Sequence, residues 1–388
     1  MSDIAATAPD HADLAEHAAQ LRSAYVHIPF CARVCPYCDF AVVAGEDDRM
    51  TSYVDAVVAE IELEPPWHRL DAVFVGGGTP SRLSVPEMTR IIEPLRGRFG
   101  LADDAEVTLE ANPEDWSPDL AEGLVGAGFT RVSFGAQSFD QAVLDALGRL
   151  HAPDQARHAV TVAREAGFRS VSLDLIFGSP VEDDASWEST VRSAIDCDPD
   201  HVSAYSLTVE PGTVLWREVR HGAAAPDPDD QAGRWETADH LLADAGFVRY
   251  EVSNHARPGH VCRYNLSVWG QGEYLAFGLG AHGFRDGVRS RRVRRLDTYI
   301  DRVRSGIGPI QATDVVAGWD AELERVMLGL RRTAGVRLGA AGAALVESEP
   351  GRRLLEAGVI AVERGRLVAT APLLTDEAVR AVLDLPPS

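Results

Sequence analysis

Positive charge is scarce in this 388-residue chain, which has 37 Lys and Arg residues against 59 Asp and Glu and a formal net charge of −22. This balance argues against a nucleic-acid partner, because proteins that bind nucleic acid present a basic face to the phosphates. Long apolar runs are also missing, and none approaches the roughly 18 residues of a membrane span. The hydrophobic share of 45% and the charged share of 25% are typical of a soluble globular protein.

Cysteine is scarce as well, with five residues in the whole chain. Three of them lie within eight residues, which leaves only Cys197 and Cys262, so we do not expect a disulfide framework. We therefore expect a protein of the reducing cytoplasm. The first twenty residues lack the basic start and the apolar run of a signal peptide, and we predict a disordered lead over residues 1–21.

The three clustered cysteines, Cys31, Cys35 and Cys38, are separated by three and then by two residues. Thiolates at such a spacing form either a metal site or a redox pair. A structural zinc ion needs four ligands, and no fourth Cys or His follows at the spacing of a zinc finger. In a cubane iron–sulfur cluster, three local thiolates would leave one of the four irons open to a small-molecule ligand. We favour such a cluster, with a zinc knuckle or unrelated cysteines as the alternative.

The triplet Ala-Gly-Phe ends three amphipathic helical segments, with its glycine at Gly128, Gly167 and Gly246. Glycine just past a helix end adopts the positive φ of a C-cap at low cost. The spacing corresponds to a period of about 40 residues, which indicates a repeat of βα units. Six such units predict an α/β fold in residues 22–250, namely an incomplete parallel (β/α)6 barrel. In parallel barrels the reactive groups gather at the carboxyl ends of the strands.

The regular pattern ends near residue 250. We expect residues 251–312 to form an irregular connecting segment. It contains an arginine patch, which we define as Arg285, Arg289, Arg291, Arg292, Arg294 and Arg295. The pattern of residues 313–388 predicts a small α+β C-terminal domain of helices and one hairpin, similar to a winged helix. Because the acidic chain makes DNA binding improbable, we expect this domain to act as a lid or a packing element.

The run Gly76-Gly77-Gly78-Thr79-Pro80 follows a predicted strand. Glycines there expose backbone amides and let a ligand approach closely, although the run lacks the pattern of a dinucleotide fingerprint or a P-loop. With the Cys-x3-Cys-x2-Cys spacing, it resembles the radical S-adenosylmethionine (SAM) superfamily. In that family the open iron of a [4Fe–4S] cluster binds the amino and carboxylate groups of SAM. The reduced cluster then cleaves SAM to a 5′-deoxyadenosyl radical.

The resemblance covers about residues 22–385 and implies a set of SAM contacts. Carboxylates suit the amine and the ribose hydroxyls of SAM, and a guanidinium suits its carboxylate. For each residue taken singly, the alternative is a tight turn or a surface ion pair. The implied contacts are Tyr25, Tyr37, Gly77, Gly78, Thr79, Glu110, Gln137, Arg149 and Asp174.

Within the superfamily, the chain most resembles the anaerobic coproporphyrinogen-III-oxidase-like branch, which contains coproporphyrinogen III dehydrogenases and HemW-type heme chaperones. The dehydrogenase pattern adds a cysteine two residues after the third, where this chain has Phe40. The resemblance therefore implies a chaperone that binds heme and passes it to acceptor proteins, including membrane-bound acceptors reached by peripheral contact. Oxidation of coproporphyrinogen, or another radical SAM reaction, remains the alternative, so enzymatic activity stays open.

Heme chaperones of this branch carry a motif similar to His-Asn-x-x-Tyr-Trp after Cys-Arg. In this chain, Cys262-Arg263 is followed instead by Tyr264-Asn265-Leu266-Ser267-Val268-Trp269. A tyrosinate can ligate heme iron, so Tyr264 is a candidate axial ligand. The arginine patch is the expected partner of the heme propionates, with a solvated basic face as the alternative. The remaining candidate ligands in this region are Cys262, His282, His255 and His260.

Overall fold

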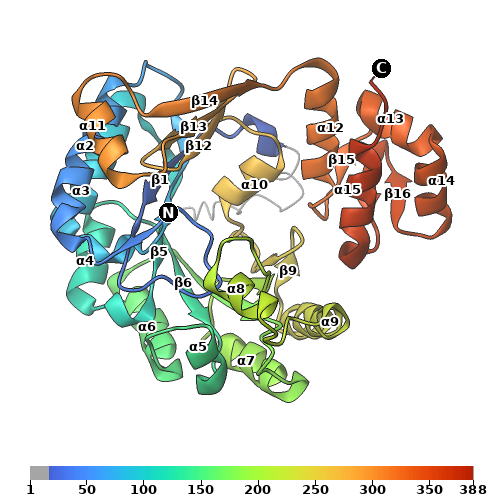
Figure 1. The fold of residues 1–388 in the computed structure, drawn as a ribbon, viewed down its shortest axis with the longest axis horizontal. Coiled ribbons are helices and arrows are strands. Elements are labelled where there is room, and N and C mark those ends of the chain that lie inside the picture. Colours follow the sequence, from blue (N-terminus) through green and yellow to red (C-terminus); the bar gives the residue numbers. More distant parts are fainter. Residues whose placement is uncertain (1–16, 388) are drawn as a thin grey trace, which may run out of the picture.

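The computed structural model describes residues 17–387. Its main body is one curved sheet of twelve strands in the order β14-β13-β12-β11-β1-β4-β5-β6-β7-β8-β10-β9 (Figure 1). Seven neighbouring strands of this order, from β11 to β8, pair in parallel. The first six of them along the chain form the predicted barrel. They are β1 (Ser23–Ile28), β4 (Leu70–Gly77), β5 (Leu101–Ala111), β6 (Arg131–Gln137), β7 (Ser170–Phe177) and β8 (His201–Ser206).

Each of these six strands leads to a helix on the outer side of the sheet (Figure 1). Because β14 and β9 end the sheet and each pairs on one side only, the barrel is incomplete. The predicted α/β fold with an incomplete (β/α)6 barrel is therefore confirmed. The six helices are α2 (Met50–Leu63), α3 (Val85–Phe99), α4 (Pro118–Gly126), α6 (Pro153–Ala166), α7 (Asp184–Asp196) and α9 (Pro228–Asp244), with short helices α5 (Gln141–Ala146) and α8 (Val214–Arg220) in the connections after β6 and β8.

The glycine caps form as the sequence predicts. Gly128, Gly167 and Gly246 have φ values of 99°, 98° and 85°. After α4, Gly128 N donates to Val125 O, and Phe129 N donates to Leu124 O at 3.1 Å. This is the double bond pattern of a Schellman motif, and it turns the following phenylalanine back into the core, where Phe129 is buried.

Side-chain alternation along the strands separates the core from the site. On β1, Ala24, Val26 and Ile28 belong to the core between the sheet and its helices, while Tyr25 and His27 line a cavity on the inner face. The same alternation on the neighbouring parallel strands turns their polar side chains inward. The barrel interior is therefore a polar, partly open space, and the apolar core lies outside it.

The prediction that residues 251–312 are irregular is wrong. The segment extends the sheet on both sides, because strands here pair with partners distant in the sequence, such as β8 with β10 and β1 with β11. Its polar strands lack the apolar alternation from which a strand is inferred, and β14 is exposed at every position. The elements are β9 (Val248–Arg249), β10 (Asn254–Ala256), α10 (Arg263–Trp269), β11 (Tyr274–Phe277), β12 (His282–Arg285), β13 (Val288–Arg292), α11 (Leu296–Arg304) and β14 (Ile310–Val315).

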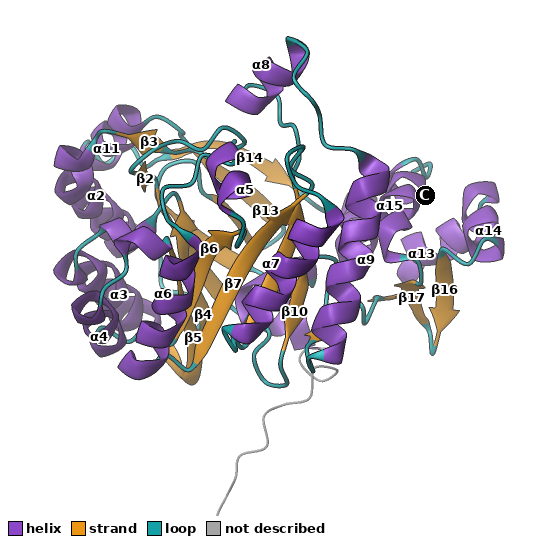
Figure 2. Cartoon of the chain, turned by 90° about the horizontal axis from the view of Figure 1, so that it is seen from below, coloured by secondary structure: helices purple, strands orange, loops and turns teal. Residues whose placement is uncertain are grey.

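The C-terminal helices and hairpin have a hydrophobic core of their own and lie beside the barrel (Figure 2). The predicted start of this domain at residue 313 falls inside β14, which pairs with β13 of the main sheet. Thr333 N donates to Tyr250 O at 3.1 Å and joins the two parts. The elements are α12 (Gly318–Gly329), β15 (Val336–Arg337), α13 (Gly339–Glu347), α14 (Glu349–Glu356), β16 (Ile360–Glu363), β17 (Arg366–Ala369) and α15 (Thr375–Leu383).

Of the predicted disordered lead, residues 1–16 lie outside the described residues. Residues Ala18–Gln20 form a short 3-10 turn. Ala18 is fully buried against Tyr250, Ala256 and Leu266, so the prediction of disorder is wrong for residues 18–20. Within residues 17–387, no helix combines the length and the apolar character that a membrane crossing requires.

Candidate functional site

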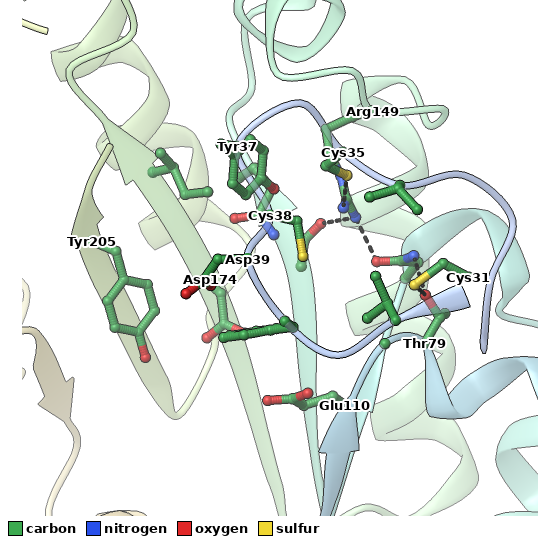
Figure 3. Close-up of a pocket in the computed structure, with 18 of the residues that line it drawn as sticks. Cys31, Cys35, Tyr37, Cys38, Asp39, Thr79, Glu110, Arg149, Asp174 and Tyr205 are labelled. Atoms are coloured by element: carbon green, nitrogen blue, oxygen red, sulfur yellow. Dashed lines mark hydrogen bonds between the residues drawn. The ribbon is translucent and has the colours of Figure 1, made fainter. Parts of the chain in front are cut away.

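The carboxyl ends of the parallel strands surround a cavity of about 400 Å³, which we call the first cavity. The cysteine loop crosses it between β2 (Phe30–Cys31) and β3 (Val43–Ala44), which pair in parallel. All three clustered cysteines line this cavity (Figure 3). So do eight of the nine SAM contacts implied by the sequence: Tyr37, Gly77, Gly78, Thr79, Glu110, Gln137, Arg149 and Asp174.

The cysteines are half-buried. Burial raises the pKa of Cys31 and raises that of Cys38 to about 11, so both thiols hold their protons at neutral pH unless a metal displaces them. Polar donors already face the sulfurs. Thr79 Oγ1 lies 3.6 Å from Cys31 Sγ, and Arg149 Nη1 lies 3.5 Å from Cys35 Sγ. Such donors stabilise thiolates, which are the form that binds iron.

No three His, Cys, Asp or Glu side chains in the described part of the chain converge as ligands of a single metal ion. The cysteines line the same cavity without meeting at one point. A cubane cluster does not require such a meeting, because each thiolate binds a different iron. The arrangement thus fits a cluster better than one zinc ion.

Packing requires the glycine run at the end of β4. A Cβ at Gly77, whose φ is +116°, would lie 2.4 Å from the ring of His27, and a Cβ at Gly78 would lie 2.8 Å from the carbonyl of Pro29. The freed backbone is used, since Gly77 N donates to Glu110 Oε2 at 2.8 Å. The run therefore forms a backbone cradle beside an acidic side chain.

Glu110 and Asp174 are acids turned into the first cavity from β5 and β7. Burial raises the pKa of Glu110 to about 7, helped by the charge of Asp174 and opposed by the Gly77 amide. Burial also raises the pKa of Asp174, although Ser133 Oγ donates to it at 3.0 Å. Both carboxylates would gain from a cation or from hydroxyl donors in the cavity.

Arg149 approaches the cavity from the loop after α5. Its Nη2 donates to Gly135 O at 3.0 Å and also to Asn112 Oδ1. Its Nε is buried and has no hydrogen-bond partner among the described residues. An N–H group left over in this way is suited to an anionic ligand.

Sequence reasoning did not single out Asn112, Ser133 or Tyr205, which also line the first cavity. Asn112 joins two predicted contacts, because it accepts from Arg149 and its Nδ2 donates to Thr79 Oγ1 at 3.1 Å. The signal for it was present, since Asn112 directly follows β5. Tyr205 stands across the cavity from the cysteines (Figure 3), and its place near the end of β8 was the available signal.

The ninth implied contact, Tyr25, lies in a second cavity of about 320 Å³. This second cavity shares four wall residues with the first: Asp39, Phe40, Gly77 and Glu110. Two of the candidate heme ligands, Tyr264 and His282, also line it. Tyr264 stacks on Tyr25 with ring centroids 5.9 Å apart.

The structure places Cys262 elsewhere. It is 1% exposed and lines neither cavity, and burial raises the pKa of its thiol well above the usual range. Cys262 is the residue directly before α10, and its backbone N donates to Tyr250 Oη at 3.4 Å. His255 and His260 instead face acids of the barrel wall: Asp239 at 3.0 Å and Asp200 at 3.8 Å, respectively.

The arginine patch is not one continuous basic surface. Arg292 is buried and donates to Glu60 at 2.9 Å, and Arg289 binds Glu324 of α12 through both carboxylate oxygens. Arg285 pairs with Glu64 at 2.7 Å. Arg291, Arg294 and Arg295 are exposed. Half of the predicted patch is therefore structural.

Several known proteins are similar to this chain in sequence and fold. The family model of the radical SAM superfamily matches residues 25–194. Over 373 residues, the chain is 41% identical to the heme chaperone HemW of Mycobacterium tuberculosis, covering 92% of this chain and 94% of the relative. The chain belongs to the HemW family of the radical SAM superfamily. Further HemW relatives are those of Bacillus subtilis, 35% identical with 81% and 85% covered, and of Escherichia coli, 37% identical with 75% and 79% covered.

Among solved structures, the chain resembles the coproporphyrinogen III oxidase HemN of Escherichia coli, described as a radical SAM enzyme. The TM-score is 0.81, with 96% of this chain and 92% of that chain covered. At 21% identity, this likeness shows the fold alone. The resemblance to the superfamily inferred from the cysteine and glycine motifs is confirmed, and so is its HemW branch.

Proposed function

We propose that this HemW-family protein is a heme chaperone, which binds heme and transfers it to acceptor proteins and which carries a [4Fe–4S] cluster and SAM. The observation that carries the proposal is the nearly full-length identity of 41% with a HemW heme chaperone. The first cavity supports the cofactors, because its cysteines, glycine cradle and unpartnered guanidinium N–H lie together.

The residues of the first cavity fit both cofactors. Cys31, Cys35 and Cys38 would each hold one iron, and a bound cluster of this class supplies an electron to SAM. Arg149 Nε would donate to the SAM carboxylate as its missing partner. Glu110, held by the Gly77 amide, would receive the amino group. A bound ammonium would bring the pKa of Glu110 down again from about 7.

Asp174, Gln137 and Tyr37 complete the proposed SAM site. Asp174 is suited to ribose hydroxyls, since Ser133 occupies only part of its accepting capacity. Gln137 has a φ of 63° where the β6–β7 register shifts. Backbone strain of this kind persists where surrounding structure imposes it, and here it accompanies a side chain that lines the cavity.

Heme acceptors complete the proposal. We propose a cytoplasmic protein whose partners are heme and heme-acceptor proteins, including membrane-bound acceptors met at the membrane surface, with no nucleic-acid partner. A coproporphyrinogen-oxidising enzyme is the competing function. Phe40, which is 62% exposed, stands where the dehydrogenase pattern has its additional cysteine.

The test combines three measurements on one anaerobically reconstituted preparation: heme titration, transfer of bound heme to apomyoglobin, and turnover of coproporphyrinogen III with SAM and reductant. We expect stoichiometric heme binding, transfer on mixing, and no turnover. Turnover at enzyme-like rates, on the order of 0.01 per second or faster, would assign the protein to the oxidase function. Absence of heme binding would refute the chaperone proposal.

A further inference from the structure

One wall of the second cavity consists of aromatic rings that pack against one another. Tyr264, Tyr25 and Phe74 contact one another in a triangle of rings, with centroids 5.0 to 6.2 Å apart. Tyr264 also meets Tyr274 edge to face at 5.9 Å. The cavity volume of about 320 Å³ lies within the range of small-molecule sites, roughly 300–1,000 Å³. Such a wall suits a flat, largely apolar ligand.

Other residues of the same cavity carry positive charge. Arg294 lines the cavity, and its Nη2 donates to the backbone carbonyl of Asp39 at 3.0 Å. His282 of β12 also lines the cavity and is exposed. In the β12–β13 pair, His282 stands directly opposite Arg291, so these two side chains share one face of the sheet. The cavity wall therefore offers an imidazole and the guanidinium of Arg294. Arg291 does not line the cavity but stands next to His282 on the neighbouring strand β13.

These arginines are available for anions. The described residues include no Asp or Glu within 4.0 Å of the guanidinium of Arg291 or Arg294, in a chain with 59 acidic residues. The sequence contains no lysine, so arginine is its only permanently charged cation. Guanidinium groups bind carboxylates in bidentate geometry.

The other possible iron ligands on this cavity are occupied. The Tyr264 ring is packed against Tyr25, Phe74 and Tyr274 as part of the aromatic wall. His27 uses both ring nitrogens, with Nδ1 3.0 Å from Tyr25 Oη and Nε2 2.8 Å from Ala41 O. The His282 ring lines the cavity and has no hydrogen bond to another described residue, so its nitrogens are free for a ligand.

We propose that the second cavity is the heme site, with His282 as the axial ligand of the iron and Arg291 and Arg294 as partners of the propionates. The macrocycle lies against the Tyr264 wall, and Phe40 at the shared boundary of the cavities provides an exposed apolar cover. This inference rests on the proposed function and specifies its ligand site. It replaces Tyr264 and Cys262 by His282 as the ligand.

The first experiment titrates ferric heme into the cluster-reconstituted protein and compares His282→Ala with His260→Ala. His260 lies outside the cavity beside Asp200, so it is the matched control. We expect His282→Ala to shift the Soret band and weaken binding at least tenfold, and added imidazole to restore the wild-type spectrum. His260→Ala should match the wild type. A Soret band unchanged in His282→Ala but shifted in Tyr264→Phe would overturn the assignment.

The second experiment compares the double variant Arg291→Gln, Arg294→Gln with Arg295→Gln. Arg295 is exposed, does not line the cavity and, unlike Arg291, is not paired with His282 between β12 and β13. We expect the double variant to weaken heme binding at least tenfold, with the Soret position kept, and to bind the dimethyl ester of heme as well as the wild type does. Equal heme affinity in the wild type and the double variant would remove the arginines from the site. If the wild type binds no heme, the proposed function itself fails.

Discussion

A buried ion pair between Glu60 of α2 and Arg292 of β13 offers a sharp test of the packing. Glu60 of α2 is 5% exposed and accepts three hydrogen bonds. Its Oε1 receives Arg292 Nε at 2.9 Å, and its Oε2 receives Tyr299 Oη at 2.6 Å and Gly278 N at 2.9 Å. One carboxylate thus ties α2 to β13, to α11 and to the turn after β11.

Replacing Glu60 with Ala should destabilise the protein by about 4 kcal/mol, because removing one member of a buried pair leaves the other charge uncompensated, at a cost of roughly 3–5 kcal/mol. This equals a change of about a thousandfold in the unfolding equilibrium. We do not expect a larger loss of stability. Burial raises the pKa of Glu60 although the charge of Arg292 lowers it, so the cost of desolvation offsets part of the attraction between the two charges.

Two further variants separate the pair from the packing. Tyr299→Phe removes one bond to a charged acceptor and should cost about 1.5–3 kcal/mol. The double variant Glu60→Met, Arg292→Met removes both charges and should recover most of the loss, since apolar side chains of similar volume often replace a buried pair without cost.

Urea unfolding measures the total effect, and hydrogen exchange at the amides of Gly278 and Leu279 measures it locally, since these amides bind Glu60 and Tyr53. We expect both amides to lose protection in Glu60→Ala. A loss of less than 1 kcal/mol, well short of the roughly 3–5 kcal/mol for a broken buried pair, or a double variant no better than the single one, would refute the reasoning.

Three other outcomes follow from the structure. Cys35→Ala should abolish the broad iron–sulfur absorbance after reconstitution, while Cys197→Ala, at the end of α7, should keep it. Gly78→Ala places a Cβ 2.8 Å from the Pro29 backbone and should cost about 1–3 kcal/mol in thermal unfolding. Burial raises the pKa of Glu251 from 4.5 to about 7, so its stabilising contribution is full below pH 4.5 and is lost as pH rises through 7. Urea unfolding at about pH 4.5 and about pH 8 should show a loss of roughly 3 kcal/mol in the wild type that Glu251→Gln lacks.

The sequence predicts the parallel half of the fold well, for a physical reason. Strands such as β4 and β7 are apolar runs buried by helices, and glycine caps mark where each unit ends. Both signals are local, so they can be recognised in one chain. Because parallel strands present their carboxyl ends at one edge, residues far apart in the chain, such as Cys38 and Asp174, can be placed together from the sequence alone.

The strands from β10 to β14 escape sequence reasoning because their positions depend on partners elsewhere in the chain. β11 finds its place beside β1 about 250 residues earlier, and β12 and β13 are short and polar. Their arginines indicate a basic surface, yet the acids that neutralise Arg285 and Arg292 come from α2 and its C-terminal end. Only the tertiary structure shows which arginines have such partners.

The net charge of the chain makes Arg291 and Arg294, which have no acidic partner among the described residues, unusual. In a chain with a net charge of −22, an arginine readily finds a carboxylate, as three members of the arginine patch do. Arg294 instead faces a cavity and donates to a backbone carbonyl, and Arg291 stands beside His282. The cavity that Tyr264 and Tyr274 line also holds the imidazole of His282 and the guanidinium of Arg294, and Arg291 lies next to His282. An iron porphyrin with two propionates needs such a ligand and such cations. The same geometry explains why a helix motif altered at Tyr264 need not abolish heme binding, since the ligand we propose lies on β12.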